Sequence, residues 1–303
     1  MGFIKMAGSV VAKTLADGMS LTRGRVPKVV RVETTNHCQA DCIFCPRSTI
    51  GRSKGFMTQE LFEKIVNECA QGGVRVLHLH NFGEPLIDKQ LPERVAFAKR
   101  AGIKKVKIFS NGGLLKGDAA NRLLRSGLDE LKVSVDGADK AEFEQLRIGL
   151  SHTEVVENTL AFRKARDAAG LKNSLRIIAT TCQSSNRAAT NEMLAQVVDR
   201  VEHTKLHNWA GSYGVLNRVK LRKPCDRLWR TFTILINGDV AICCRDHAGK
   251  EVIGNVSQDS IQQVWNNHRY EELRRLHRES RQEEIPICSN CTSCYFGARH
   301  EAA

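Results

Sequence analysis

Aromatic residues, long apolar runs and blocks of basic residues are all scarce in this sequence, and each scarcity disfavours a class of protein. Only 6% of the 303 residues are aromatic, which disfavours a surface that stacks nucleic-acid bases. Lys5 and Lys13 interrupt the apolar residues of the first 20 positions, so we expect no membrane span and only an amphipathic helix there.

The charge balance is strongly basic but not clustered. The formal net charge is +13 at pH 7, which can indicate an RNA, a membrane surface or an acidic substrate as partner. Lys and Arg are scattered along amphipathic segments rather than gathered in patches. Because patches rather than totals mark nucleic-acid binding, we do not expect a nucleic-acid partner.

Cysteine, in contrast, is plentiful. The chain has 11 cysteines, most of them in tight groups, and no convincing signal peptide, which indicates metal ligands in a reducing cytoplasm. Cys38, Cys42 and Cys45 form a C-x3-C-x2-C group. Three such thiolates can hold three irons of a [4Fe–4S] cluster and leave the fourth iron open to an external molecule. Zinc would need a fourth ligand, for which the adjacent His37 is the candidate.

Short apolar runs alternate with helical patterns over residues 26–209, which predicts an α/β fold with a parallel sheet. Thr58 is expected to cap a helix that ends near Gly72. Further helices are predicted at 91–101, 119–126, 153–169 and 191–201. The six expected strands are 29–33, 74–80, 106–110, 130–135, 175–181 and 205–209.

The cysteine group, with Phe44 just before its last cysteine, resembles the radical S-adenosylmethionine (SAM) superfamily. The resemblance implies that the strands curl into a partial (β/α)6 barrel with function at their C-terminal ends. It implies that the open iron is chelated by SAM, and that an external one-electron donor such as a flavodoxin or ferredoxin reduces the cluster. SAM would then yield a 5′-deoxyadenosyl radical, which removes a hydrogen atom from an unactivated C–H.

Motifs that follow the second, third and fourth strands supply the expected SAM contacts. Gly83-Glu84-Pro85 is similar to the family's Gly-Gly-Glu-Pro motif, with Phe82 in place of the first glycine, and would meet the SAM ammonium group. By the same resemblance, Ser134 and Arg147 would hold the SAM carboxylate, with Asn111 near the same ligand. Turn chemistry at the Asn-Gly pairs and a surface ion pair for Arg147 are the alternatives.

A second cysteine set resembles the auxiliary-cluster unit called SPASM, or its one-cluster form Twitch. A hairpin is predicted around Asn237-Gly238, and Gly238-x4-Cys243 is part of the pattern. The resemblance implies an auxiliary [4Fe–4S] cluster, although a zinc ribbon is an alternative. The expected ligands are Cys225, Cys243, Cys288 and Cys291, with Cys294 able to replace one of them.

These patterns divide the chain into four parts. We expect an N-terminal amphipathic extension over 1–28, a partial barrel over 29–212, a small α+β auxiliary domain over 213–296 and a tail over 297–303.

The resemblance to one-cluster enzymes of aminoglycoside pathways implies the oxidation of an alcohol carbon to a ketone. The substrate would be a small polar molecule such as an aminosugar or cyclitol. His80, at the end of the second strand, is a candidate general base, and Trp209 could wall the substrate pocket.

Three other functions remain open from the sequence. A sugar epimerase would use a thiol of Cys244 or Cys182 as hydrogen donor, although free cysteine is often only a small buried hydrophobe. A ribosomal-peptide maturase would need a peptide-binding N-terminal domain, for which residues 1–28 are too short. Gly83-Glu84-Pro85 argues against a non-catalytic protein that binds zinc and RNA.

Overall fold

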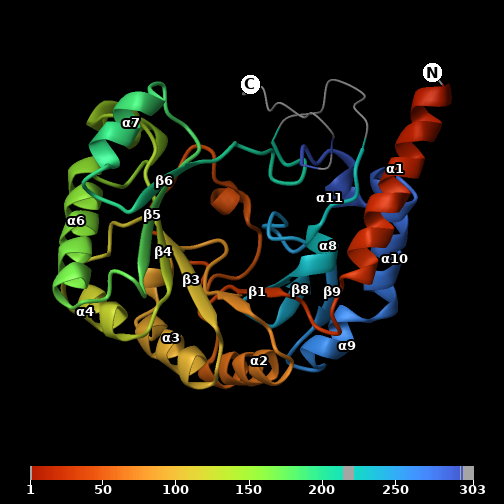
Figure 1. Cartoon of the computed structure of the whole chain (residues 1–303), viewed down its shortest axis with the longest axis horizontal. Coiled ribbons are helices and arrows are strands. Elements are labelled where there is room, and N and C mark those ends of the chain that lie inside the picture. Colours follow the sequence, from red (N-terminus) through yellow and green to blue (C-terminus); the bar gives the residue numbers. More distant parts are fainter. Residues whose placement is uncertain (1, 214–221, 294, 296–303) are drawn as a thin grey trace.

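The computed structural model of the chain describes residues 2–213, 222–293 and 295. Its strands form one sheet in the order β6-β5-β4-β3-β2-β1-β7-β8-β9. The first six strands are all parallel to their neighbours, which confirms the predicted α/β class. In Figure 1 these strands curve around the centre of the molecule and the helices cover their outer face.

The barrel part of the sheet consists of β1 (Val29–Val32), β2 (Val76–His78), β3 (Lys105–Ser110), β4 (Glu130–Ser134), β5 (Arg176–Thr181) and β6 (Arg200–His203). Its helices are α2 (Gln59–Gln71), α3 (Leu91–Arg100), α4 (Gly117–Arg125), α5 (Lys140–Leu146), α6 (His152–Ala168) and α7 (Arg187–Leu194). Two short 3-10 turns, η1 (Pro46–Thr49) and η2 (Pro85–Ile87), lie between them.

Alternating burial along the strands shows which side chains face the barrel interior. In β3, Val106 and Ile108 are fully buried under the helices. Lys107 and Phe109 alternate with them and are half-buried on the opposite face, as the period of two in a strand requires. The predicted cap of α2 is confirmed, because the Thr58 side chain accepts a hydrogen bond from the backbone N–H of Leu61.

The sixth strand is not where the sequence pattern placed it. It spans Arg200–His203 rather than 205–209, and the preceding helix ends at Leu194 rather than at 201. Asp199 fixes the start of β6, because it accepts a hydrogen bond from the Ile177 backbone N–H and pairs with Arg166. Trp209 therefore lies beyond the strand, in a turn with a φ of 45°.

Residues 222–293 continue the same sheet. They form α8 (Arg227–Arg230), β7 (Thr231–Ile234), β8 (Asp239–Ala241), β9 (Val252–Asn255), α9 (Ile261–Trp265), α10 (His268–Arg278), η3 (Gln282–Glu284) and α11 (Pro286–Ser289). β7 pairs in parallel with β1, and β7 and β8 form the predicted hairpin. Gly238 permits its turn with a φ of 87°.

The N-terminal segment forms helix α1 (Gly2–Leu21), which packs against α10 as Figure 1 shows. Trp229 on α8 donates a hydrogen bond from Nε1 to the Ser20 hydroxyl, over 2.9 Å. The amphipathic helix expected at the N-terminus is thus docked on the outside of residues 222–293. Within the described ranges, no helix is long and apolar enough to cross a membrane.

Candidate active site

A cavity of about 260 Å³ contains the cysteine trio and nearly all the predicted SAM contacts. Most of the side chains come from the C-terminal ends of β1 to β4 or from the segments that follow them, so the parallel sheet brings them to one edge. Trp209 comes from the segment after β6. The lining residues are Cys38, Ala40, Cys42, Phe44, Cys45, Arg47, His80, Asn81, Phe82, Gly83, Glu84, Phe109, Ser110, Asn111, Ser134, Arg147 and Trp209. Pro85 is not among them, since it begins the buried turn η2.

The three thiols lie within electrostatic reach of one another. Burial, together with the charges of the neighbouring Cys42 and Cys38, raises the pKa of Cys45 to about 11. Two donors face the trio, because Asn111 Nδ2 lies 3.7 Å from Cys38 Sγ and Arg147 Nη1 lies 3.7 Å from Cys42 Sγ. These donors would stabilise thiolates bound to iron.

A cubane cluster needs a wider spacing of sulfur atoms than one metal ion does. Among the described residues, no three His, Cys, Asp or Glu side chains are arranged to hold a single ion. The fit to a cluster therefore rests on the shared cavity and on the donors that face the thiols.

The Glu84 carboxylate is hydrogen-bonded to neighbouring segments of the cavity wall. It accepts hydrogen bonds from Ser110 Oγ at 2.8 Å and from the backbone N–H groups of Asn111 at 2.6 Å and Leu86 at 3.0 Å. Burial raises the pKa of Glu84 to about 7 despite these bonds. The Glu84 backbone N–H donates to His37 O at 2.8 Å, which joins this loop to the cysteine loop.

Phe82, the departure from the family motif, contacts the auxiliary part of the chain. Its ring lies 5.3 Å from the ring of Trp209 and 5.9 Å from that of His247. Glycine could not make either contact, so the substitution adds an apolar wall between the barrel and residues 222–293.

Arg147 is buried, so the alternative expectation of a surface ion pair for this residue is wrong. Its Nε and Nη2 contact Asp136 Oδ2 at 2.8 and 2.6 Å, which leaves Nη1 toward Cys42. Asp136 Oδ1 also accepts hydrogen bonds from the backbone N–H groups of Cys182 and Gln183. Sequence reasoning did not assign Asp136, although it follows the predicted Ser134 by two positions.

The three candidate catalytic residues lie in different places. His80 lines the cavity, its ring 4.3 Å from that of Phe109, and burial and the charge of Arg31 hold its pKa well below the usual value. Cys182 lies beside Asp136, and Cys244 Sγ accepts from Arg227 Nη1 at 3.4 Å. Neither thiol is among the residues that line the two cysteine cavities or the cavity bordered by Arg245.

The predicted auxiliary ligands converge on a second, small cavity of about 20 Å³, while Cys294 lies outside the described residues. Burial and the nearby Cys225 and Cys291 raise the pKa of the Cys288 thiol. Because the four thiols come from segments far apart in sequence, a bound cluster would join those segments. The cysteines that line this cavity are Cys225, Cys243, Cys288 and Cys291.

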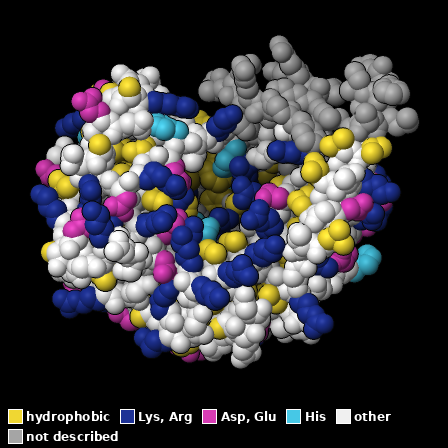
Figure 2. Space-filling view, viewed as in Figure 1, with side chains coloured by type: hydrophobic (Ala, Val, Ile, Leu, Met, Phe, Trp, Pro, Cys, Tyr) yellow, Lys and Arg dark blue, Asp and Glu magenta, His cyan; other side chains and the backbone are white. Residues whose placement is uncertain are grey.

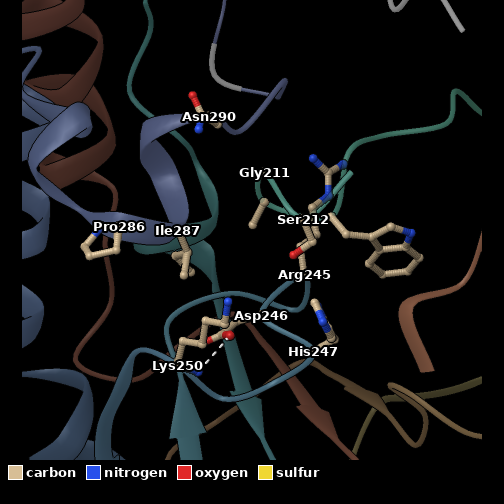
Figure 3. A pocket seen from close by; sticks show the side chains of 11 residues that line it. Gly211, Ser212, Arg245, Asp246, His247, Lys250, Pro286, Ile287 and Asn290 are labelled. Carbon is tan, nitrogen blue, oxygen red and sulfur yellow. Dashed lines mark hydrogen bonds between the residues drawn. The ribbon is translucent and has the colours of Figure 1, made fainter. Parts of the chain in front are cut away.

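A third cavity of about 160 Å³ lies between these two (Figure 3). It shares Trp209 with the first cavity, and Ala210, Arg245 and Ile287 with the second. The Trp209 indole N–H donates to Phe44 O at 2.7 Å, and Asn208 Nδ2 donates to Asn290 O at 2.6 Å. The 207–213 segment thus joins the first cysteine loop to the loop that carries Cys291.

Two family models match the chain. The model of the radical SAM superfamily matches residues 32–178, and that of SPASM, an iron–sulfur cluster-binding domain, matches residues 225–292. The chain carries a radical SAM domain followed by a SPASM domain. Its radical SAM domain binds SAM and a [4Fe–4S] cluster, and its SPASM domain binds auxiliary iron–sulfur. This pair of domains favours an enzyme over the zinc- and RNA-binding alternative.

Curated relatives agree with the family but are matched only in part. A probable GTP 3′,8-cyclase of Methanococcus maripaludis is 32% identical over 127 residues, which are 42% of this chain and 42% of the relative. A PqqA peptide cyclase of Streptomyces rochei is 28% identical over 209 residues, or 67% of this chain and 54% of the relative. The chain thus spans about two fifths to one half of these relatives.

Solved structures share the fold over most of the chain. BtrN in complex with AdoMet and 2-DOIA is 20% identical with a TM-score of 0.65, covering 89% of this chain and 94% of that one. SuiB of Streptococcus suis, bound to the precursor peptide SuiA, is 15% identical with a TM-score of 0.68, covering 84% and 68%.

Proposed function

We propose that this radical SAM enzyme oxidises an alcohol carbon of a small polar substrate, such as an aminosugar or a cyclitol, to a ketone. The observation that carries the proposal is the row of three adjoining cavities. Trp209 borders the first and third of them, and Arg245 borders the third and second. A substrate in the third cavity would lie between the SAM site and the auxiliary cysteines.

When bound, SAM and its reduced cluster supply a radical that takes a hydrogen atom from the substrate carbon, and the auxiliary cluster accepts the second electron. Cys38, Cys42 and Cys45 would hold the first cluster. The auxiliary ligands would be Cys225, Cys243, Cys288 and Cys291.

Arg147 would bind the SAM carboxylate through Nη1, which lies beside Cys42 Sγ, because Asp136 occupies its Nε and Nη2. Ser134 and Asn111 line the same wall.

The reacting part of the substrate would extend from the third cavity past Trp209 into the first cavity, where His80 would accept the hydroxyl proton. Its Nδ1 has no hydrogen-bond partner among the described residues. Its lowered pKa keeps the ring neutral at pH 7 and able to accept.

A peptide substrate is the second candidate, since SuiB was solved with a precursor peptide. The volume of the third cavity, about 160 Å³, favours a compact substrate over a peptide chain. Neither Cys182 nor Cys244 lines any of the three cavities, which does not favour them as the hydrogen donor of an epimerase.

Cys38→Ala is expected to abolish the formation of 5′-deoxyadenosine from SAM under dithionite, because the SAM-binding cluster loses one of its three protein ligands. Anaerobic incubation followed by chromatography measures the product. Cys69→Ala is the matched control, since Cys69 lies in the core of α2. If Cys38→Ala forms 5′-deoxyadenosine at the control's rate, the proposed function is wrong.

A further inference from the structure

Three arginines at the border between the barrel and residues 222–293 lack carboxylate partners. The charges of Arg31 on β1, Arg227 on α8 and Arg245 after β8 all act on the Cys244 thiol. Among the residues that the structure describes, none of the three forms an ion pair. Five other largely buried arginines do pair with a carboxylate: Arg52, Arg94, Arg147, Arg166 and Arg274.

Two of the three have other partners. Arg227 Nη1 lies 3.4 Å from Cys244 Sγ, so it faces the auxiliary cysteines, whose cluster would carry negative charge. Arg31 Nη2 lies 3.3 Å from His78 Nδ1. Burial lowers the pKa of His78 to about 3, so the imidazole is neutral and can accept this hydrogen bond.

Arg245 differs from the other two in bordering the third cavity as well as the auxiliary cysteines. Its Nη1 is buried and has no hydrogen-bond partner in the described part of the chain, and the side chain borders the third cavity. A buried N–H group that donates to no acceptor is costly. An anion in that cavity would remove this cost.

The rest of the cavity lining leaves room for such an anion. In Figure 3, Pro286 and Ile287 face Ser212 and Arg245 across the cavity. The one acidic lining residue, Asp246, accepts hydrogen bonds at 2.9 Å from the backbone N–H groups of Lys250 and Glu251. The carboxylate of Asp246 is therefore hydrogen-bonded within its own loop. Figure 2 shows Lys and Arg side chains gathered around the central hollow of this face.

We propose that the third cavity binds an anionic oxygen group of the substrate, a phosphate or a carboxylate, against Arg245. The planar guanidinium matches the oxygen pairs of both groups. The inference rests on the proposed function, because the cavity that would hold the anionic group shares Trp209 with the SAM cavity. It narrows the substrate class to acidic small molecules.

Isothermal titration of the reconstituted holoenzyme with inorganic phosphate and with succinate tests this proposal. SAM is kept in excess so that the open iron is occupied, and chloride keeps the ionic strength constant. We expect saturable binding of at least one anion. Tighter binding of phosphate would indicate a phosphate group on the substrate, and tighter binding of succinate would indicate a carboxylate. Arg245→Gln should weaken that binding by about 10- to 100-fold, and Arg245→Lys by less.

Two further variants separate anion binding from cluster support. Arg230→Gln removes an exposed arginine of α8 and should bind like the native enzyme. Ser212→Glu places an acid in the cavity wall, away from the cysteines, and should block binding with the iron content unchanged. Lack of saturable binding by the native holoenzyme, or undiminished binding by Ser212→Glu or by iron-replete Arg245→Gln, would overturn the proposal.

The cleavage of SAM, measured on the same preparations, reports on the proposed function separately. A holoenzyme that forms 5′-deoxyadenosine but binds neither anion refutes the anion site alone. One that binds an anion through Arg245 but forms no 5′-deoxyadenosine refutes the proposed function alone.

Discussion

The side chains around the cysteine trio are hydrogen-bonded to other residues, and these contacts set both their protonation and their orientation. Glu84 is the clearest case, since three donors surround its carboxylate while burial still raises its pKa to about 7. The group is therefore half protonated near neutral pH, where an exposed glutamate would be fully charged.

Glu84 should make the stability of the metal-free protein depend on pH. Because its folded pKa of about 7 exceeds the ordinary glutamate value of 4.5, its contribution to stability is full below pH 4.5 and falls as the pH rises to 7. The free energy of unfolding of the native protein should drop by about 3 kcal/mol relative to Glu84→Gln over this range. Urea titrations at several pH values measure the difference, and a constant difference would contradict the assignment.

Asp136 should be essential to the placement of Arg147. Asp136→Asn keeps the shape but leaves a buried guanidinium without its counter-ion, which should cost about 3–5 kcal/mol of stability. Asp118→Asn is the matched control, because Asp118 pairs with Arg122 on the surface and should change stability by less than ~0.5 kcal/mol. Equal unfolding midpoints for the two variants would refute the role of Asp136.

Residue types with a spacing signature could be predicted from the sequence, whereas partners distant along the chain could not. The cavity brings together Cys38, Cys42 and Cys45, as their C-x3-C-x2-C spacing suggested. Asp136 and Arg245 have no such signature, because each acquires its role from the folding of separate loops onto one site.

At the scale of elements, the loop after β2 and the cysteine loop pack too closely for any side chain between them. Gly83 has a φ of 152°, and a Cβ there would lie 2.5 Å from Thr35 O. The Gly-Glu-Pro motif thus fixes the position of the cysteine loop through backbone contact, in addition to any contact with SAM.

Gly83→Ala should destabilise the protein by at least ~2 kcal/mol more than Gly102→Ala. Both glycines have positive φ, but a Cβ at Gly102 meets no atom within 4 Å. Both variants bear the strain of an alanine at positive φ, so the difference between them reports the steric clash at Gly83 alone. Chemical denaturation and the iron content after reconstitution measure the effect, and similar values for the two variants would show that the close approach is unimportant.

The strands were predictable where apolar alternation was strong, as in β3, and not where it was weak. β6 has one apolar residue, Val201, in four, and its position depends on the pairing of Asp199 with Arg166. The turn at Trp209 likewise could not be predicted, because no sequence pattern indicates a positive φ at a tryptophan.

At the scale of the molecule, one sheet joins the SAM site to the auxiliary cysteines. β7 pairs with β1, the strand that leads into the first cysteine loop, and the 207–213 segment closes the other side through Trp209 and Asn208. The two cysteine sets are therefore held on either side of the third cavity by a common framework. This arrangement is what the proposed oxidation requires, because the substrate must meet a radical on one side and an electron acceptor on the other.

The most direct test of this account is iron and acid-labile sulfide per chain, with zinc, after anaerobic reconstitution of the Cys38/Cys42/Cys45→Ala protein. We predict about four irons per chain, held by the auxiliary cysteines and available to accept an electron. A protein that holds zinc and no iron would show that these cysteines are structural, and it would contradict the oxidation of the substrate through an auxiliary cluster.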